Sequence, residues 1–480
     1  MPEGTILNII AAVHEISNWL IRVIMLLVIT RRHRPQSALV WLLVVFITPW
    51  VGLLLYALLG TNRLPRKRVK QHRRFMDSLD AAAARLTGNS DIARPTLDPA
   101  FRSTERLAQR LGHMAVVGGN KAEIICANEE LLERMIHDID AAKHHVHVLY
   151  YIYEDDPYGR RFAQALIRAK KRGVACRLLV DAVGSWGMLK HMAPELAKAG
   201  IEVYEALPVG LFRKGMARWD LRNHRKLVVV DGCVAYTGSH NMIDAGYGTE
   251  TLQWHDLSLR LSGPLVLQLQ TVFMADWYFE TDDLLDDPAF FPKENVRGDL
   301  AAQTIPSGPN YPTENYQRLI LSALHSAQEQ VTITTPYFVP DDSLMIALES
   351  AALRDVEVNL IVPKKSDQIV VGAAAQAHYE ELMNWGINLY LYEPAIIHAK
   401  IMTIDGAVAF VGTSNFDIRS FSLNFEINLA FYSPSFAKEL RERQKRYIEA
   451  STRLEPDVWD NRSTARRIYQ NLAKLFSPLL

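Results

Sequence analysis

Cysteine is scarce in this chain of 480 residues, and its scarcity excludes two classes of protein. The three cysteines, Cys126, Cys176 and Cys233, lie far apart in the sequence. A disulfide-stabilised secreted scaffold needs more of them, and a Cys-rich metal site needs closely spaced ligands. An excess of charge is lacking as well, because Lys+Arg and Asp+Glu both number 53. The bulk charge therefore predicts no particular partner.

Charged residues are absent from the stretch Pro35 to Asn62. A helix of roughly 23 such apolar residues would be about 34 Å long, which is enough to cross the hydrocarbon core of a bilayer. Pro49 lies within this stretch and is expected to kink the helix. The sequence therefore predicts a membrane-spanning helix over about residues 37–59.

An earlier hydrophobic stretch, over about residues 5–30, is predicted to form another helix. His14, Glu15, Asn18 and Arg22 fall on one face of it, so this helix is amphipathic. We expect it to span the bilayer with that face against a partner; the alternative is a helix lying in the interface. Two spans would make residues 1–62 a hydrophobic helical hairpin. A cleaved signal peptide is not expected, because "MPEG" carries no basic residue and no small-residue cleavage site is evident.

Basic runs flank the later hydrophobic stretch. "RRHR" (Arg31–Arg34) precedes it, and "RLPRKRVKQHRR" (Arg63–Arg74) follows it within a predicted basic linker, residues 63–104. The second run carries more charge and adjoins the bulk of the chain, so the positive-inside bias places that bulk in the cytoplasm. The same run is expected to contact anionic lipid headgroups.

The remaining chain alternates strand-like and helix-like segments and contains the same series twice. Landmarks of the two series are offset by 174 to 186 residues: His224 matches His398, and Gly200 matches Gly386. Two related α/β domains are therefore predicted, over residues 105–290 and 291–480. The boundary is expected in the polar, Pro-bearing stretch of residues 282–312.

Each series ends in the same motif, "HRKLVVVDGCVAYTGSHN" (His224–Asn241) and "HAKIMTIDGAVAFVGTSN" (His398–Asn415). The apolar runs around Asp-Gly predict two β-hairpins with two-residue turns. Strand alternation puts the histidine and the lysine of each motif on one face. A two-residue turn would place Ser239 opposite His224 and Thr413 opposite His398.

This combination of side chains suits a phosphate diester. Lysine supplies positive charge, and hydroxyl and amide groups donate hydrogen bonds to phosphate oxygens. Histidine acts as a nucleophile or a proton donor near neutral pH. No carboxylate cage or Cys/His spacing accompanies the motifs, so we expect neither a metal ion nor a cofactor. The predicted phosphate-binding residues are Lys226, Lys400, Ser239, Asn241, Thr413 and Asn415.

The motif aspartates, Asp231 and Asp405, are predicted to serve the turn. Asp231 lies seven residues from His224, which is about 23 Å along a strand. A histidine base also needs an acceptor on its other ring nitrogen. Aligning "WHDLSLRLSGP" with "FEINLAFYSP" places Asp256 against Glu426, and these carboxylates are predicted to orient the histidines.

Together the two motifs resemble those of the phospholipase D superfamily, in which two H-x-K-x4-D-x6-G-[ST]-x-N motifs meet in one active site. The sequence looks in particular like the bacterial cardiolipin synthases of the phospholipase D type. This closer resemblance rests on the hydrophobic N-terminus and on "YYIYEDDPYG", "TPYFVPDD" and "SNFDIRSFSLNFE". It implies two α/β domains, mixed sheets flanked by helices, packed face to face. It also implies a catalytic set of His224, Lys226, Asp231, His398, Lys400 and Asp405.

The resemblance further implies a reaction and a location. His224 would attack the phosphorus of phosphatidylglycerol, and His398 would protonate the departing glycerol. A second phosphatidylglycerol would then take the phosphatidyl group from His224 to give cardiolipin. The implied partners are phosphatidylglycerol, cardiolipin and the anionic bilayer, with a multi-pass protein in the bacterial inner membrane and catalytic domains facing the cytoplasm. Oligomeric state is left open.

Other functions use the same chemistry. A hydrolytic phospholipase D, or a transferase using another alcohol or a donor such as phosphatidylethanolamine, is the alternative. A phosphodiesterase acting on nucleic acid is disfavoured, because basic residues concentrate beside the membrane segment rather than along an aromatic groove. A noncatalytic scaffold is disfavoured because both motifs are complete.

Several further polar or aromatic residues are compatible with purely structural roles. The histidines 144, 145 and 147 are predicted at a strand end, and the acidic run 154–156 in a loop, where capping is favoured over headgroup contact. Arg419 is expected in either a lipid contact or an internal salt bridge. Trp219 and Trp254 are equally compatible with packing and with ligand contact.

Overall fold

A computed structural model describes residues 3–33, 35–60, 68, 70–71, 74–75, 98–209, 220–246, 253–292, 296–475 and 477. The chain divides into two compact units, Met1–Leu64 and Pro65–Leu480. Each unit is described by itself.

The first unit consists of helices, and it differs from the predicted pair of spans. Its helices are α1 (Glu3–Arg32), α2 (Pro35–Ile47) and α3 (Pro49–Leu59). Among the described residues, one helical stretch, Asn8–Arg32, is long and apolar enough to cross a membrane. The predicted second span is instead two short helices, because Pro49 has no N–H for the helix ladder and begins a new helix after Thr48.

The second and third helices fold back on each other. Tyr56 near the end of α3 packs edge-on against Trp41 of α2, with ring centroids 5.3 Å apart. The Tyr56 hydroxyl also lies 3.1 Å from Nε2 of His33, which precedes α2. In one straight helix, residues 41 and 56 would lie about 22 Å apart along the axis. The chain therefore leaves this hairpin near the point where it entered.

One α1 side chain contacts the turn of this hairpin. The Arg22 guanidinium donates to the Phe46 carbonyl oxygen at 3.2 Å. Ile21, Met25 and Ile29 share that side of α1 and pack with Val45 in a small apolar core. Two residues of the polar face predicted for this helix thus have places within the unit, because Arg22 bonds to the hairpin and Asn18 is buried.

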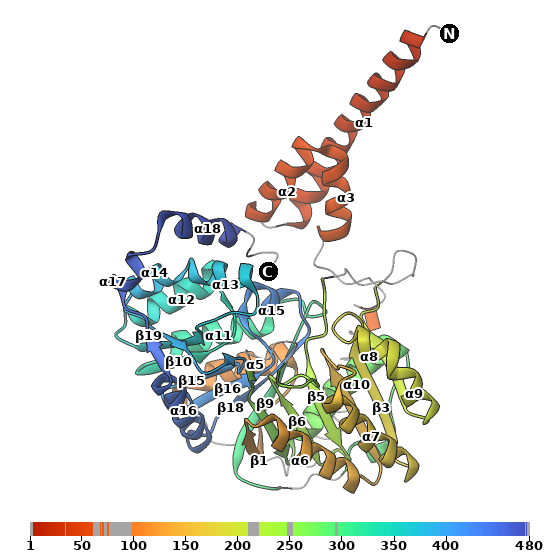
Figure 1. Ribbon diagram of the computed structural model, residues 1–480, viewed down its shortest axis with the longest axis vertical. Helices are drawn as coiled ribbons and strands as arrows, with labels where there is room; N and C mark the ends of the chain where they lie inside the picture. The colour runs from red at the N-terminus through yellow and green to blue at the C-terminus, as the bar shows by residue number, and fades with distance from the viewer. Residues whose placement is uncertain are drawn as a thin grey trace. The chain divides into compact units, whose positions relative to one another are not determined.

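The second unit contains the two predicted α/β series (Figure 1). The elements of the first series are η1 (Pro99–Phe101), α5 (Arg102–Gly112), β1 (Val117–Ile125), α6 (Asn128–Ala141), β2 (His145–Tyr150), α7 (Pro157–Lys171), β3 (Ala175–Asp181), α8 (Trp186–His191), α9 (Ala193–Lys198), β4 (Glu202–Ala206), β5 (Lys226–Val230), β6 (Val234–Gly238), β7 (Trp254–His255), β8 (Ser258–Ser262), α10 (Leu265–Thr281) and η2 (Pro288–Phe290).

The second series repeats this order and adds helices at its end. Its elements are β9 (Leu300–Ser307), α11 (Asn315–Ser326), β10 (Gln330–Thr334), β11 (Phe338–Val339), α12 (Asp342–Ala352), β12 (Glu357–Pro363), α13 (Ile369–Gln376), α14 (Tyr379–Asn384), β13 (Asn388–Tyr392), β14 (Ile396–Ile397), β15 (Ile401–Ile404), β16 (Val408–Gly412), β17 (Phe416–Asp417), α15 (Ile418–Ser422), β18 (Glu426–Phe431), α16 (Pro434–Glu449), β19 (Ser451–Arg453), α17 (Pro456–Asp460) and α18 (Thr464–Leu475).

The two series share one mixed sheet. Among the described residues it has 15 strands, in the order β19-β13-β12-β10-β15-β16-β18-β9-β1-β8-β6-β5-β2-β3-β4. Strand β9 pairs antiparallel with β18 of its own series and with β1 of the other. The halves, which were expected to pack face to face, are thus joined edge to edge by hydrogen bonds between β1 and β9.

Apolar side chains on both faces of this sheet explain its layers. In β2, Val146 and Val148 pack in one core with residues of α6 and α7, whereas Leu149 points into a second core. That second core also holds residues of α10 and α16, and it includes Ile401 from the other half. Strands buried on both faces are expected where parallel pairs carry helical crossovers.

One helix of the first predicted domain packs in the other half. Ala108 of α5 belongs to the apolar core around Tyr316 and Leu319 of α11. The Thr104 hydroxyl lies 2.9 Å from that of Ser322, and Asn315 donates to the Leu111 carbonyl. Helix α5, which begins near the boundary predicted between the linker and the first domain, therefore packs with the second half.

Candidate active site

Sheet topology brings the two motifs to equivalent edges. Strand β5 begins at Lys226, which pairs with Tyr150, the last residue of β2. Strand β15 begins at Ile401, which pairs with Thr334, the last residue of β10. Both motifs therefore lie at the carboxyl ends of parallel strands, where ligand sites in open α/β sheets are usually found.

Backbone hydrogen bonds join each motif histidine to the opposite half. The His224 amide donates to the Phe425 carbonyl at 2.9 Å, and the His398 amide donates to the His255 carbonyl at the same distance. Short parallel pairing of β14 with β7 continues this contact on the His398 side. The two motifs thus belong to one site formed by both halves.

The two candidate orienting carboxylates reach the histidines across the same junction. Nδ1 of His224 lies 3.0 Å from the Glu426 carboxylate, and Nδ1 of His398 lies 2.7 Å from Asp256. Each carboxylate therefore binds the histidine of the other half, a crossing that alignment within one series could not show. A proton held on Nδ1 by a carboxylate leaves Nε2 as the basic nitrogen.

The motif hydroxyls support these carboxylates. Ser239 donates to Asp256 at 2.6 Å, and Thr413 donates to Glu426. These two residues were predicted to bind phosphate, whereas the structure directs their hydroxyls to the acidic side chains. The amides of Asn241 and Asn415 are also buried, and their Oδ1 atoms have no hydrogen-bond partner in the described part of the chain.

Both motif lysines are buried beside their histidines. Nζ of Lys226 donates to the His224 carbonyl at 2.8 Å, and Nζ of Lys400 donates to the His398 carbonyl at 2.6 Å. Burial disfavours the charged ammonium, so it lowers the pKa of Lys226 to about 8 and that of Lys400 to about 7. An anion bound beside the lysines would therefore stabilise their charged forms.

Burial also keeps the two imidazoles neutral. It lowers the pKa of His224 to about 4, and the nearby lysine ammonium groups oppose the effect of Glu426. The pKa of His398 is lowered to about 3, again chiefly by burial and then by Lys400. Lys400 also acts on His224, and Lys226 acts on His398, so the charge of each motif reaches the imidazole of the other.

The Asp256 carboxyl stays ionised in this environment. Its burial alone would raise its pKa, but the hydrogen bond from His398 and the positive charge of Lys400 hold the pKa well below its ordinary range. An ionised carboxylate on Nδ1 fixes the ring orientation of His398 and favours a proton on that ring when one is needed.

The motif aspartates lie at the far end of their strands and hold the backbone. The Asp231 carboxylate accepts from the amides of residues 143, 144 and 145 at 2.8 to 2.9 Å. The Asp405 carboxylate accepts from the amides of residues 328, 329 and 330, each at 2.9 Å. This is the turn role expected for them, and it separates them from the histidines.

The predicted strand register was wrong by one residue. Val230 pairs with Val234, and Ile404 pairs with Val408, so each connection contains three residues rather than two. Asp231 and Gly232 both adopt positive φ, and the Cys233 amide bonds back to Val230, which leaves Cys233 outside the ladder. Ser239 consequently lies one position away from direct pairing with His224.

Three side chains of the site carry no motif signal. The Tyr151 ring lies against His224, with centroids 4.8 Å apart, and Trp254 stacks on His398 at 4.2 Å. Buried Asp181 accepts from the Asn223 amide at 2.8 Å and binds Arg222. The signal for Asp181 was its place at the end of a predicted strand, where polar residues often serve a site.

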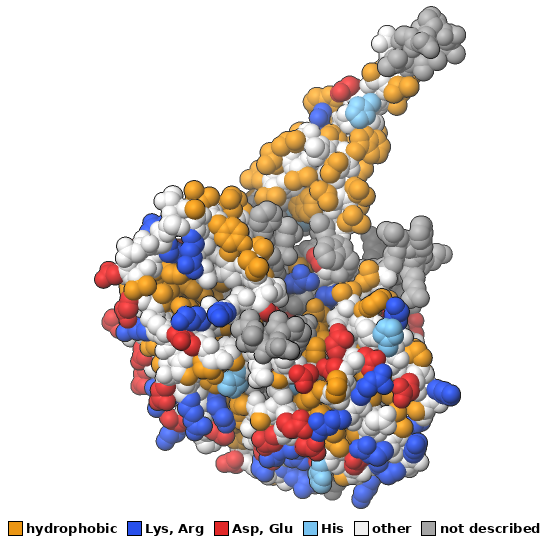
Figure 2. Space-filling view, in the orientation of Figure 1, with side chains coloured by type: hydrophobic (Ala, Val, Ile, Leu, Met, Phe, Trp, Pro, Cys, Tyr) orange, Lys and Arg blue, Asp and Glu red, His pale blue; other side chains and the backbone are white. Residues whose placement is uncertain are grey.

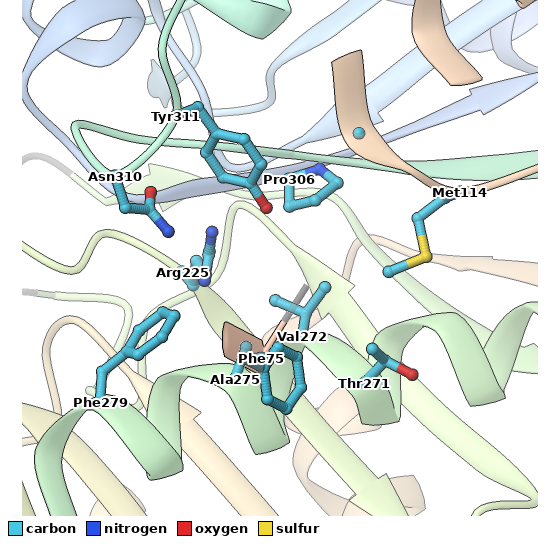
Figure 3. Close-up of a pocket in the computed structure, with 11 residues that line it drawn as sticks. Phe75, Met114, Arg225, Thr271, Val272, Ala275, Phe279, Pro306, Asn310 and Tyr311 are labelled. Atoms are coloured by element: carbon cyan, nitrogen blue, oxygen red, sulfur yellow. The ribbon is translucent and has the colours of Figure 1, made fainter. Parts of the chain in front are cut away.

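Arg225 lies between His224 and Lys226 in the sequence, and its side chain points to the opposite face of the strand from theirs. Its guanidinium binds Asp276 at 2.5 Å and donates to the carbonyl oxygens of Glu426 and Ser307. Figure 3 shows it beside Asn310 and Tyr311, at a small pocket behind the motif strand. Arg225 therefore fixes the junction of the halves beneath the histidines.

The remaining residues considered from sequence have structural contacts or lie outside the described residues. His145 and His147 are fully buried inside β2, and the described residues contain no group of three His, Cys, Asp or Glu side chains that could hold a metal ion. Asp156 caps α7 by accepting from the Gly159 amide at 2.7 Å. Arg419 donates to the Asp220 carbonyl at 2.9 Å, and Trp219 lies outside the described residues.

Comparison with known proteins finds relatives over nearly the whole chain. A family model described as "Cardiolipin synthase, PLD-like domain" matches residues 135–277 and 320–448, and one described as "Phospholipase_D-nuclease N-terminal" matches residues 6–60. A cardiolipin synthase A from Shigella boydii is 34% identical over 493 aligned positions, covering 99% of this chain and 100% of that protein. One from Yersinia pseudotuberculosis is 35% identical with the same coverage.

A solved structure shares the fold at low sequence identity. The phosphatidylserine synthase of Haemophilus influenzae has a TM-score of 0.59 and 14% identity, and the match covers 79% of this chain and 98% of that one. With two motif-bearing domains matched and relatives aligned over their whole length, this chain belongs to the cardiolipin synthase family of phospholipase D-like proteins.

Proposed function

We propose that this protein is a cardiolipin synthase that transfers a phosphatidyl group from one phosphatidylglycerol to another, releasing glycerol. The crossed histidine–carboxylate pairs are the observation that carries the proposal. They orient both imidazoles at the junction of the halves, with a motif lysine beside each, which supports sequential attack and proton transfer on a single phosphorus atom. The full-length similarity to cardiolipin synthases supports the choice of substrate.

In the first step, Nε2 of His224 attacks the phosphorus atom of phosphatidylglycerol. A phosphorus–nitrogen bond forms, the bond from phosphorus to the glycerol oxygen breaks, and His398 gives its proton to that oxygen. His398 has to be protonated for this step, and the phosphodiester anion supplies the opposite charge that raises its lowered pKa. The assignment of His224 as nucleophile follows the family resemblance, and it agrees with its greater side-chain exposure, 12% against 4%.

In the second step, the free hydroxyl of another phosphatidylglycerol enters where glycerol left. Neutral His398 removes its proton, the oxygen attacks phosphorus, and the bond to His224 breaks to give cardiolipin. Lys226 and Lys400 stabilise the charge on the nonbridging oxygens throughout. The unpaired Oδ1 atoms of Asn241 and Asn415 suit hydroxyl donors, which makes them candidates to orient the glycerol groups.

Purified enzyme incubated with phosphatidylglycerol labelled in its glycerol headgroup tests this function. Equal amounts of free labelled glycerol and cardiolipin are expected. Phosphatidic acid as the main lipid product would contradict transfer and favour hydrolysis. Adding unlabelled phosphatidylethanolamine to the same assay shows whether that lipid serves as a phosphatidyl donor, through release of ethanolamine.

The N-terminal unit supports a membrane topology with one span. Helix α1 is apolar and long enough to cross the bilayer, whereas α2 and α3 measure about 20 Å and 16 Å and fold back on each other. The turn of that hairpin contains no charged residue. Each helix alone is too short for a hydrocarbon core of about 30 Å, so we expect the hairpin to enter and leave the membrane on one face.

Arg22 indicates the depth of this hairpin. It lies ten residues before the basic end of α1, about 15 Å along the axis, and donates to the freed Phe46 carbonyl at the turn. An α2–α3 hairpin that enters and leaves on one face puts both basic runs, 31–34 and 63–74, on that face. The positive-inside bias then places both runs and the catalytic unit in the cytoplasm.

A further inference from the structure

Exposed apolar side chains gather at the sheet edge that carries the candidate active site. Trp186 begins α8 after strand β3 and is 62% exposed, and Ile369 begins α13 after β12 and is 77% exposed. Val183 and Val370 accompany them. The strands β3 and β12 are equivalent in the two halves, and both segments follow the carboxyl ends of their strands. Both halves thus present apolar groups at the same topological position.

Hydrogen bonds connect the first of these segments to the candidate nucleophile. The Ser185 hydroxyl, next to Trp186, donates to the Tyr151 carbonyl at 2.9 Å and accepts from the Tyr153 amide. The ring of Tyr151 lies against His224. The exposed Trp186 therefore directly follows Ser185, which is hydrogen-bonded to a residue of the site.

The second segment has a corresponding connection. Gln368, next to Ile369, donates to the Tyr337 hydroxyl at 3.2 Å, and the same hydroxyl donates to Asp367. Phe338, the neighbour of Tyr337, pairs with Phe416, which directly follows Asn415 of the second motif. Both apolar segments therefore border the same site from opposite halves.

Helix α18 extends this surface and turns its larger apolar side outward. Its inner side carries buried Gln470, which donates to Gln376 of α13 at 2.8 Å, and the small side chain of Ala473. A surface helix normally turns its apolar side inward. The outward side of α18 carries the exposed residues Ile468, Tyr469, Leu472 and Leu475. Figure 2 shows hydrophobic side chains gathered over α18 and α13.

Basic side chains accompany these apolar groups. Nζ of Lys190 lies 4.9 Å from the centre of the Trp186 ring, and Arg466 is exposed on α18. Lys365 is exposed just before α13, beside Lys364, which pairs with Glu393 at 2.8 Å. Apolar and aromatic side chains bordered by lysine and arginine are typical of surfaces that enter the interface of an anionic bilayer.

We propose that these residues form an apolar rim, comprising Val183, Trp186, Ile369, Val370, Ile468, Tyr469, Leu472 and Leu475, that docks the catalytic unit on an anionic phospholipid bilayer. The inference deepens the proposed function and rests on it, because the rim turns the entrance of the site toward the headgroups of the substrate. A bilayer is chosen over a protein partner because both halves carry the rim and basic residues border it on both.

Fluorescence from the rim tests the docking without any turnover. In full-length protein with exposed Cys233 changed to Ser, Leu472→Cys is labelled with an environment-sensitive dye and reconstituted in vesicles of equal phosphatidylglycerol and phosphatidylcholine. Blue-shifted emission that is quenched by spin-labelled lipid is expected. The control is Leu353→Cys, which is 74% exposed and precedes β12 at the opposite edge of the sheet.

Equal spectra at positions 472 and 353, with no lipid quenching at either, would overturn the proposal. A blue shift at 472 that follows protein density rather than lipid quenching would overturn it in favour of contact with a second copy. Neither result depends on cardiolipin formation, so failure of the rim and failure of the proposed function are distinguishable.

Activity gives a second, independent readout. The double variant Ile468→Ser/Leu472→Ser is expected to lose at least tenfold in rate on phosphatidylglycerol in vesicles. Its rate on a short-chain, monomeric phosphatidylglycerol is expected to match that of the unmodified protein, because the chemistry is intact. Leu353→Ser should be unaffected on both substrates. An equal loss on both substrates would indicate damage to the fold and contradict a role in docking.

Discussion

At the scale of single residues, the crossed pairing makes the two carboxylates distinguishable by mutation. Glu426→Gln removes the charge that holds Nδ1–H of His224, and Asp256→Asn does the same for His398. Each change is expected to lower kcat by about a thousandfold, since an amide in this position permits the wrong tautomer. Steady-state transfer between phosphatidylglycerol molecules measures the loss.

A donor with a nitrophenolate leaving group separates the two roles. That group departs without a proton, so Asp256→Asn is expected to recover its first step and release nitrophenolate rapidly. Glu426→Gln acts on the nucleophile and should stay slow. If Asp256→Asn were the slow variant and Glu426→Gln the fast one, the assignment of nucleophile and acid would have to be exchanged.

The motif aspartates are expected to affect stability rather than chemistry. Asp231→Asn keeps a side chain that tolerates the positive φ of this position but weakens three charge-assisted hydrogen bonds. The free energy of unfolding should fall by about 2 kcal/mol. Thermal unfolding in detergent checks this, with Asp405→Asn as the matched variant.

Activity of Asp231→Asn measured well below its Tm should stay within about threefold of the unmodified protein. A thousandfold loss in kcat with an unchanged Tm would contradict the structural role and place the aspartate in the chemistry.

The lysines set a pH limit on substrate capture. A lysine is charged below its pKa, so raising the pH through 7 to 8 removes charge from Lys400 and then Lys226 in the free protein. The value of kcat/KM for phosphatidylglycerol should therefore fall over this range. Bound substrate raises both pKa values, so kcat should persist to higher pH. A kcat/KM that stays flat to pH 9.5 would contradict the lowered pKa values.

Sequence reasoning at this scale recovered the participants but not all of their contacts. The motif spacing predicted the histidines and lysines, and alignment on Pro264 and Pro434 found Asp256 and Glu426. It could not show that each carboxylate crosses to the other half, because that depends on tertiary packing. Nor could it predict that Ser239 and Thr413 face the carboxylates, since a three-residue turn shifted the register.

At the scale of elements, the N-terminal hairpin makes the clearest prediction. A cysteine replacing His33, between α1 and α2, should be shielded from an impermeant thiol reagent in intact cells and labelled after the inner membrane is opened. A cysteine at Gly4, before the span, should be labelled from outside. Both belong in a background with Cys233 changed to Ser.

Two spanning helices would give the reverse pattern at these two positions, so the experiment separates the topologies. Sequence predicted the apolar stretches and the influence of Pro49. It did not predict that the chain reverses there, because the contact of Tyr56 with Trp41 and His33 depends on how the two helices pack.

The packing of helix α5 with the other half could not be predicted from the sequence either. The duplication predicted two α/β units and a junction near residues 282–312, and β9 within that stretch does connect the halves. Helix α5, however, packs on α11 of the other half. Its amphipathic pattern shows that one side is buried, but a sequence pattern does not identify which core receives it.

At the scale of the whole catalytic unit, the duplication explains why neither half is expected to work alone. The orienting carboxylate for each imidazole comes from the other half, and one sheet passes through both. Chemistry at one phosphorus atom thus depends on the junction that Arg225 helps to fix.

Trapping the covalent intermediate tests this account most directly. His398→Gln and His224→Gln are each mixed with a phosphatidyl donor bearing nitrophenolate, quenched within milliseconds, and analysed by mass spectrometry of their peptides. We predict that His398→Gln releases close to one equivalent of nitrophenolate and retains the phosphatidyl group on His224, whereas His224→Gln releases none. Multiple turnovers by each single variant, showing that either imidazole works without the other, would contradict the claim that both act on one phosphorus atom.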